Sequence, residues 1–224
     1  MNKLFTLLAL TISFSINAQM SDDSSGCSAT GSNAVAMGRN TTASGPSSTA
    51  MGFQSTASGI YSTAMGETTL ASGSRSVAMG SYTTASGDYS TAMGQDNTAS
   101  GVTSTAMGGN TTASGNISTA MGANTTASDF ASLVIGQYNS SGSSVTNNAT
   151  SFSTSNTAFV IGNGTNSSNK SDAFKVMFNG DTTVSNDLTV SGDVVISSDA
   201  RLKSNIVSLG STLPKLLQID GKSY

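Results

Sequence analysis

The sequence predicts an all-β protein, in which a single chain winds into a parallel β-solenoid (a β-roll) of fourteen-residue coils. Three observations support this fold class. Gly recurs every seven residues from Gly31 to Gly122, seven Met residues recur every fourteen, and about a third of the 224 residues are Ser or Thr. Self-similarity at a fixed short period indicates a stack of similar units, each of which contacts its neighbours.

Composition excludes several classes of function. The chain has no His, which excludes an imidazole base and His-ligated metals. A single Cys, Cys27, excludes an internal disulfide framework and a thiolate metal cluster. Nine basic against twelve acidic residues give a net charge of −3, which argues against a nucleic-acid surface. We therefore expect no cofactor, no metal and no nucleic-acid partner.

Residues 1–18 have the features of an export signal. Lys3 supplies a positive start, and the apolar run from Leu4 to Ile16 is followed by a small residue, Ala18, suited to cleavage. The run is too short to span a bilayer comfortably. We expect residues 19–28 to be a linker, no transmembrane anchor after them, and a secreted or surface-exposed product.

Two motifs alternate along the repeat, as in Thr49-Ala50-Met51-Gly52 and Thr56-Ala57-Ser58-Gly59. A coiled coil needs large apolar residues in each heptad and disfavours Gly, and collagen needs Gly at every third position. What remains is a strand, a Gly turn and a second strand, which together make one coil. Asp129 replaces the expected Gly once, and Gly136 resumes the phase.

Strand alternation assigns the faces of the coil. Ala occupies the same place in both half-repeats, and a narrow lumen accommodates its small side chain, so Ala faces inward and Met faces outward. An exposed apolar column of this length is typical of an interface. We predict that it is a subunit interface, most simply around a threefold axis, formed by Met37, Met51, Met65, Met79, Met93, Met107, Met121 and Ile135.

The alternating Ala-Met-Gly and Ala-Ser-Gly units resemble the head repeats of trimeric autotransporter adhesins. That family usually has Ile where Met stands here, and Leu133-Val134-Ile135-Gly136 and Phe159-Val160-Ile161-Gly162 are closer to its pattern. The resemblance covers residues 29–165 and implies a homotrimer of left-handed parallel β-rolls. The chain shows neither a coiled-coil stalk nor a membrane anchor of that family, so we do not expect it to transport itself.

Two segments depart from the regular repeat. Residues 137–156 are rich in Ser, Asn and Thr, which indicates a surface loop or an irregular coil. Residues 166–196 carry short apolar runs broken by Asn179-Gly180 and Ser191-Gly192-Asp193, which indicates a β-rich neck of short strands and tight turns.

Residues 197–224 begin a different pattern. Ile206, Leu209, Leu213 and Leu216 have helical spacing, and Pro214 suits a first helical turn. The run from Ser198 to Ile206, Ser-Asp-Ala-Arg-Leu-Lys-Ser-Asn-Ile, is similar to the opening of the phage endosialidase-type intramolecular chaperone. The resemblance implies that this incomplete domain assists trimerisation and cleaves itself off between Ser197 and Ser198, with Ser198 as nucleophile and Lys203 as base.

We thus expect a secreted or surface-exposed trimeric fibre or adhesin head, for which the sequence does not identify the receptor. A phage-derived tail fibre is an alternative that the export signal argues against. Ice or crystal-surface binding is another, through a Thr column beside Ser (Thr42, Thr56, Thr84, Thr98, Thr112 and Thr126).

Two other kinds of site are less well supported by the sequence. Aromatics at the turns form no predicted site (Phe53, Tyr61, Tyr82, Tyr89, Phe130 and Tyr138). A glycan hydrolase would need paired carboxylates, and those of the roll share no position in the repeat (Glu67, Asp88, Asp96 and Asp129).

Overall fold

The computed structural model describes residues 26–193, and the chain divides into two units, Met1–Asp187 and Leu188–Tyr224. The predicted export signal and the predicted chaperone segment, with Ser197, Ser198 and Lys203, lie outside the described residues. In the second unit, residues 188–193, which belong to the predicted neck of short strands, are exposed and form no strand.

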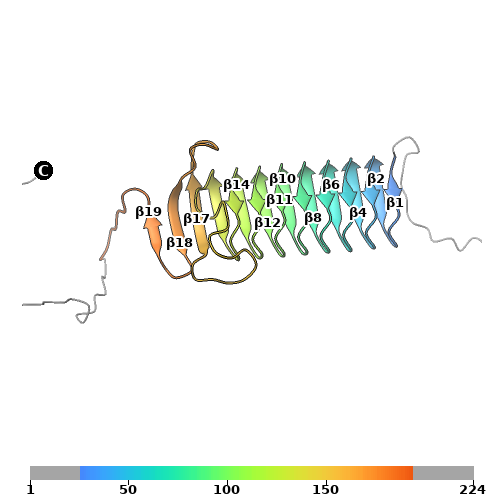
Figure 1. The fold of residues 1–224 in the computed structure, drawn as a ribbon. Helices are drawn as coiled ribbons and strands as arrows, with labels where there is room; N and C mark the ends of the chain where they lie inside the picture. Colours follow the sequence, from blue (N-terminus) through green and yellow to red (C-terminus); the bar gives the residue numbers. More distant parts are fainter. Residues whose placement is uncertain (1–25, 194–224) are drawn as a thin grey trace, which may run out of the picture. The chain divides into compact units, whose positions relative to one another are not determined.

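The first unit is a solenoid of two sheets in which all strands of the repeat run parallel (Figure 1). The short-strand sheet contains β1 (Ser28–Ala29), β3 (Thr42–Ala43), β5 (Thr56–Ala57), β7 (Leu70–Ala71), β9 (Thr84–Ala85), β11 (Thr98–Ala99), β13 (Thr112–Ala113) and β15 (Thr126–Ala127). The long-strand sheet contains β2 (Val35–Arg39), β4 (Thr49–Phe53), β6 (Thr63–Glu67), β8 (Val77–Ser81), β10 (Thr91–Gln95), β12 (Thr105–Gly109), β14 (Thr119–Ala123), β16 (Leu133–Gln137), β17 (Thr157–Asn163), β18 (Asp172–Met177) and β19 (Thr182–Val184).

Each residue of the repeat pairs with the residue fourteen positions away. In β10 and β12, Thr91 pairs with Thr105 and Met93 with Met107, and the same register holds from β2 to β14. The predicted fold class, a parallel β-solenoid of fourteen-residue coils, is confirmed, and its residues 26–187 contain no helix.

The interior contains four columns of small side chains. The two Ala columns, from Ala36 and Ala43 onward, are fully buried, as predicted; the column of the long-strand sheet continues into the fully buried Val134 and Val160, and that of the short-strand sheet ends at Ala127. Two polar columns, which the sequence did not predict as internal, complete the lumen; Ser48 and Ser62 belong to one, and Thr83 and Asn97 to the other. Because an alanine methyl contributes only about 0.8 kcal/mol on burial, close stacking of the coils must supply much of the stability.

The Gly residues allow this close stacking. A Cβ on Gly59 would lie 2.0 Å from the carbonyl oxygen of Gly73 in the next coil, and a Cβ on Gly66 would lie 2.0 Å from that of Gly80. The left-handed turn position lies two residues further on and is occupied by non-Gly residues with φ between 43° and 61°, such as Tyr61 (φ 58°) and Thr68 (φ 54°). Gly is required because neighbouring backbones nearly touch, and the Gly residues of the long strands, such as Gly66 (φ 126°), also hold a conformation that L residues rarely adopt.

The segment between β16 and β17 covers the end of the short-strand sheet. The Asn139 side chain accepts from the amide of Thr126 (2.8 Å) and donates to its carbonyl (2.9 Å), as a neighbouring strand would. The buried carboxylate of Asp129 accepts from the amides of Thr146 (2.6 Å) and Thr157 (2.8 Å). The segment is irregular, as expected, but it also caps the roll by means of buried polar side chains.

Two antiparallel strands extend the long-strand sheet beyond the last coil. β18 pairs with β17 and β19 pairs with β18, and a tight turn at Asn179 and Gly180 joins the two (Figure 1). The short-strand sheet ends at β15, so β18 and β19 have no strand of that sheet opposite them.

Candidate interaction surfaces

The outer face of the long-strand sheet carries the Met column. Each Met follows a fully buried Ala in its strand and is itself partly exposed in the single chain, so it points away from the lumen. Ile135 continues the column after Met121 and is equally half-buried. The predicted outward orientation is confirmed, and the eight side chains form one straight row across β2 to β16 (Met37, Met51, Met65, Met79, Met93, Met107, Met121 and Ile135).

This apolar face widens toward β18. Ile161 pairs with Phe174, and Phe159 pairs with Val176, so that two apolar residues per strand stand on the outer face. The Phe159 and Phe174 rings lie 6.0 Å apart between centroids. The sequence did not predict these four residues as part of the interface, and the outward position of Phe174 and Val176 depends on the antiparallel register of β18, which cannot be read from the parallel repeat.

The outer face of the short-strand sheet is polar. Its Thr column is half-buried, with exposed Leu70 as the single exception, and five of its seven Ser residues are exposed (Ser44, Ser58, Ser72, Ser86 and Ser100). Ser128, the last Ser of this column, is buried. The reason is the irregular segment, whose Gly142 carbonyl accepts from the Ser128 amide at 2.9 Å.

One turn edge of the roll carries a stack of large side chains. The guanidinium of Arg75 lies 5.3 Å from the ring centroid of Tyr61 and 5.3 Å from that of Tyr89, one coil away on either side. Its Nη1 also donates to the Tyr89 hydroxyl at 3.1 Å. These contacts join successive coils, and we interpret them as packing along the roll.

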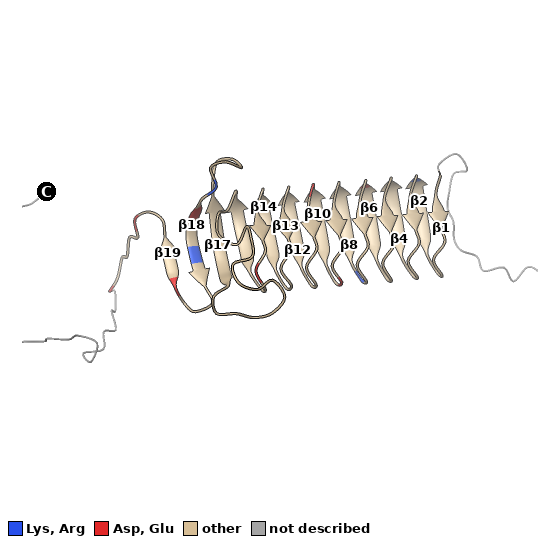
Figure 2. Ribbon diagram, viewed as in Figure 1, with Lys and Arg blue, Asp and Glu red and all other residues tan. Residues whose placement is uncertain are grey.

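The acidic side chains of the roll are dispersed, and those with a hydrogen bond bind backbone amides. Residues 26–193 contain no group of three His, Cys, Asp or Glu side chains placed to hold a metal ion. Asp88 accepts from the Ser74 amide (2.9 Å) and Asp129 from two amides, so both have structural partners. In Figure 2 the coils carry few charges, which gather instead around β18. Ser198 and Lys203, the predicted self-cleavage pair, cannot be placed because they lie outside this part of the chain.

The fold defines a repetitive β-solenoid of the kind that forms adhesin heads, and comparison with known families agrees. The sequence pattern of the YadA head domain repeat matches residues 29–55, 43–66, 57–83, 71–97 and 99–125. These segments together cover less than half of the chain, all of it within the regular coils. No curated protein matches the chain. The regular roll is thus built from YadA-type head repeats, the repeats of trimeric autotransporter adhesins, which are surface proteins. None of residues 26–193 forms a helix that could cross a membrane.

Proposed function

We propose that this protein is an exported homotrimeric adhesin head, whose rolls associate through the Met column and Ile135. The match to YadA-type head repeats supports adhesion at a surface. The observation that carries the trimer is the continuous apolar row on the outer face of β2 to β16. A row of eight side chains at a strand spacing of about 4.8 Å is roughly 34 Å long, more than a monomeric surface usually leaves exposed.

Light scattering on the purified exported protein tests the trimer. We expect a mass close to three times that of the chain, which is 22.4 kDa before any processing. The double variant Met79→Glu/Met93→Glu should lower this mass, because association would bury two unpaired carboxylates. Ser86→Glu is the matched control, since Ser86 is exposed on the opposite sheet and its substitution should leave the trimer intact. A monomeric wild-type protein, or equal dissociation of the control, would refute the proposed interface.

We also propose that residues 197–224 begin a self-cleaving chaperone, with Ser198 as nucleophile and Lys203 as general base. The support is the run from Ser198 to Ile206, and a lysine of lowered pKa can activate a serine without His. Expression of the wild-type chain should give a fragment that ends at Ser197, and Ser198→Ala should abolish it. The neighbouring Ser204→Ala is the control. A fragment that persists in Ser198→Ala would refute the assignment.

Ice or crystal-surface binding remains a second candidate because of one observation. The Thr column of the short-strand sheet is in perfect register, as in Thr98 with Thr112, and stands beside exposed Ser. Thermal hysteresis of the purified protein separates the candidates. An adhesin head should show none at millimolar concentration, whereas a hysteresis lost on Thr98→Lys would favour this second function.

A further inference from the structure

A polar cavity lies where the roll ends, on the side of the long-strand sheet opposite the Met column. Lys175 of β18 pairs with Val160, whose side chain is fully buried in the core, and Thr183 of β19 pairs with Lys175. Directly paired residues point to the same face of a sheet, so Lys175 and Thr183 point to the inner face. No strand of the short-strand sheet stands opposite them, which leaves a cavity of about 430 Å³.

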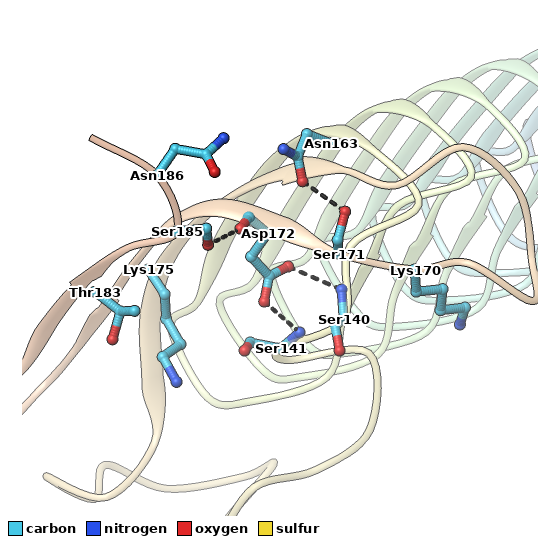
Figure 3. A pocket seen from close by; sticks show the side chains of 10 residues that line it. All are labelled: Ser140, Ser141, Asn163, Lys170, Ser171, Asp172, Lys175, Thr183, Ser185 and Asn186. Atoms are coloured by element: carbon cyan, nitrogen blue, oxygen red, sulfur yellow. Dashed lines mark hydrogen bonds between the residues drawn. The ribbon is translucent and has the colours of Figure 1, made fainter. Parts of the chain in front are cut away.

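The walls of this cavity are held in place by hydrogen bonds (Figure 3). The two carboxylate oxygens of Asp172 accept from the amides of Ser140 and Ser141, each at 2.8 Å. The Ser171 hydroxyl donates to the side-chain oxygen of Asn163 at 2.7 Å. These contacts join the capping segment to the start of β18 and the two ends of the loop between β17 and β18 to each other, so the cavity is formed before any ligand arrives.

The polar groups that remain without a partner point to a ligand with one negative charge. Lys170 and Lys175 both line the cavity and have no ion-pair partner among the described residues, and in Figure 3 they stand on either side of Ser140 and Ser141. Asp172 is the single carboxylate of the lining and already accepts from two amides. Two ammonium groups and one carboxylate leave a net charge of +1.

Neutral donors and acceptors outnumber the charges. Within residues 26–193, the hydroxyls of Ser140 and Thr183 and the side-chain amide of Asn186 line the cavity without a hydrogen-bond partner. These side chains are exposed to solvent, so an apolar ligand would displace the water around them without replacing its hydrogen bonds. A phosphate dianion would exceed the net charge of the lining, whereas a carboxylate surrounded by ring hydroxyls matches both the charge and the hydroxyls.

We propose that this cavity binds a carboxylated sugar residue of the hexuronic acid type. Lys175 binds the carboxylate, Lys170 adds a second positive charge to the lining, and Ser140, Thr183 and Asn186 hydrogen-bond to the ring hydroxyls. The volume is that of a small-ligand site and suits one or two sugar rings. Association of rolls through the Met column leaves the cavity open, because it lies on the other face of the sheet. A carboxylated sugar would be the ligand class of the proposed adhesin. The role of the site in adhesion rests on the proposed function, whereas the binding of the sugar does not.

Titration calorimetry of the full exported protein with glucuronate, glucose and inorganic phosphate tests the site. We expect glucuronate to bind with a Kd of about 1 mM, and glucose and phosphate at least tenfold more weakly. Lys175→Met, which keeps the apolar stem, and Thr183→Val should each weaken glucuronate binding, the former at least tenfold. Arg39→Met removes a positive charge at the other end of the roll, where Arg39 stacks on Phe53 at 4.4 Å, and should leave binding unchanged.

Three results would overturn the inference. They are equal affinity for glucose and glucuronate, equal or tighter binding of phosphate, and glucuronate binding that survives Lys175→Met. The solution mass of each variant is measured in parallel. Loss of sugar binding by a protein that is still a trimer refutes neither the interface nor the adhesin, and sugar binding by a monomer would refute the trimer alone.

Discussion

The backbone of Gly66 lies against the carbonyl oxygen of Gly80 in the next coil, so closely that a Cβ on Gly66 would stand 2.0 Å from that oxygen. Real Cβ atoms essentially never approach an oxygen to this distance, and backbone atoms cannot move aside as a flexible side chain can. Gly66 also has φ +126°, a conformation that L residues rarely adopt. The same contact repeats along the roll, and it explains why the period of Gly is strict.

Gly66→Ala should therefore destabilise the roll by several kcal/mol, because it forces two coils apart and strains the backbone at once. Thermal unfolding followed by circular dichroism measures the effect. Gly109→Ala is the matched control, because Gly109 lies in a strand of the same sheet and a Cβ there meets nothing within 4 Å. A similar loss in both variants would show that the close approach is not what requires Gly66.

Relief of strain at a turn should have the opposite effect. Ile117 holds a left-handed conformation (φ 61°) that disfavours β-branched residues, and its side chain is exposed. Asn tolerates this conformation, so Ile117→Asn should raise the free energy of unfolding by about 1 kcal/mol. Chemical denaturation measures the change. Asn33 occupies the same position of the fourteen-residue repeat and has φ 57°. The reverse substitution, Asn33→Ile, should therefore lower the free energy of unfolding by a similar amount. A change in the free energy of unfolding in the same direction for both variants would contradict this explanation.

Asp129 should be essential for the cap although it interrupts the repeat. Its buried carboxylate accepts from the amides of Thr146 and Thr157, so Asp129→Ala should cost about 2–4 kcal/mol in local stability. Hydrogen exchange of residues 138–156 reports the loss. Asp129→Gly restores the heptad but should loosen this segment equally, because it also removes the carboxylate.

Glu67→Ala is the control for the Asp129 variants, since Glu67 is an exposed acidic side chain of the regular coils. It should leave the exchange of residues 138–156 unchanged. If residues 138–156 exchanged more slowly in Asp129→Gly than in the wild-type protein, the interruption of the repeat by Asp129 would have no structural role.

The regular part of the roll was predictable because every coil repeats the same local chemistry. The fourteen-residue period predicted the coil, and alternation around Ala50 predicted that Met51 faces outward. The left-handed residue of each turn escaped prediction, because Tyr61, Arg75 and Thr68 share no side-chain property that marks this conformation. The neighbouring coil fixes the backbone there, and a local pattern does not contain that constraint.

The end of the roll was the part that the sequence could not specify. The register of β18 against β17 places Lys175 on the inner face and Phe174 on the outer face, and it includes irregularities on both sides of Val160. Neither the cavity nor the wider apolar face follows from periodicity, because both arise where the repeat stops. Asn139 and Asp129 likewise have roles that depend on contacts distant in sequence, such as the 28 residues between Asp129 and Thr157.

Two neighbours in one internal column should respond oppositely to the same substitution. Asn97 is fully buried, and its side chain donates to the carbonyls of Met93 (2.6 Å) and Gly108 (2.8 Å) and accepts from the Thr111 amide (2.8 Å). Thr83, one coil earlier, is fully buried too, but its hydroxyl has no hydrogen-bond partner within residues 26–193.

Asn97→Val should lower the free energy of unfolding by about 3 kcal/mol or more, because it leaves several buried backbone groups unsatisfied. Thr83→Val replaces an unsatisfied hydroxyl with a methyl of similar size and should raise stability by up to about 1 kcal/mol. Chemical denaturation of the two variants beside the wild-type protein measures both changes. If the two variants were destabilised by similar amounts, the hydroxyl of Thr83 would also have a hydrogen-bond partner. Hydrogen bonds would then stabilise this column at Thr83 as well as at Asn97.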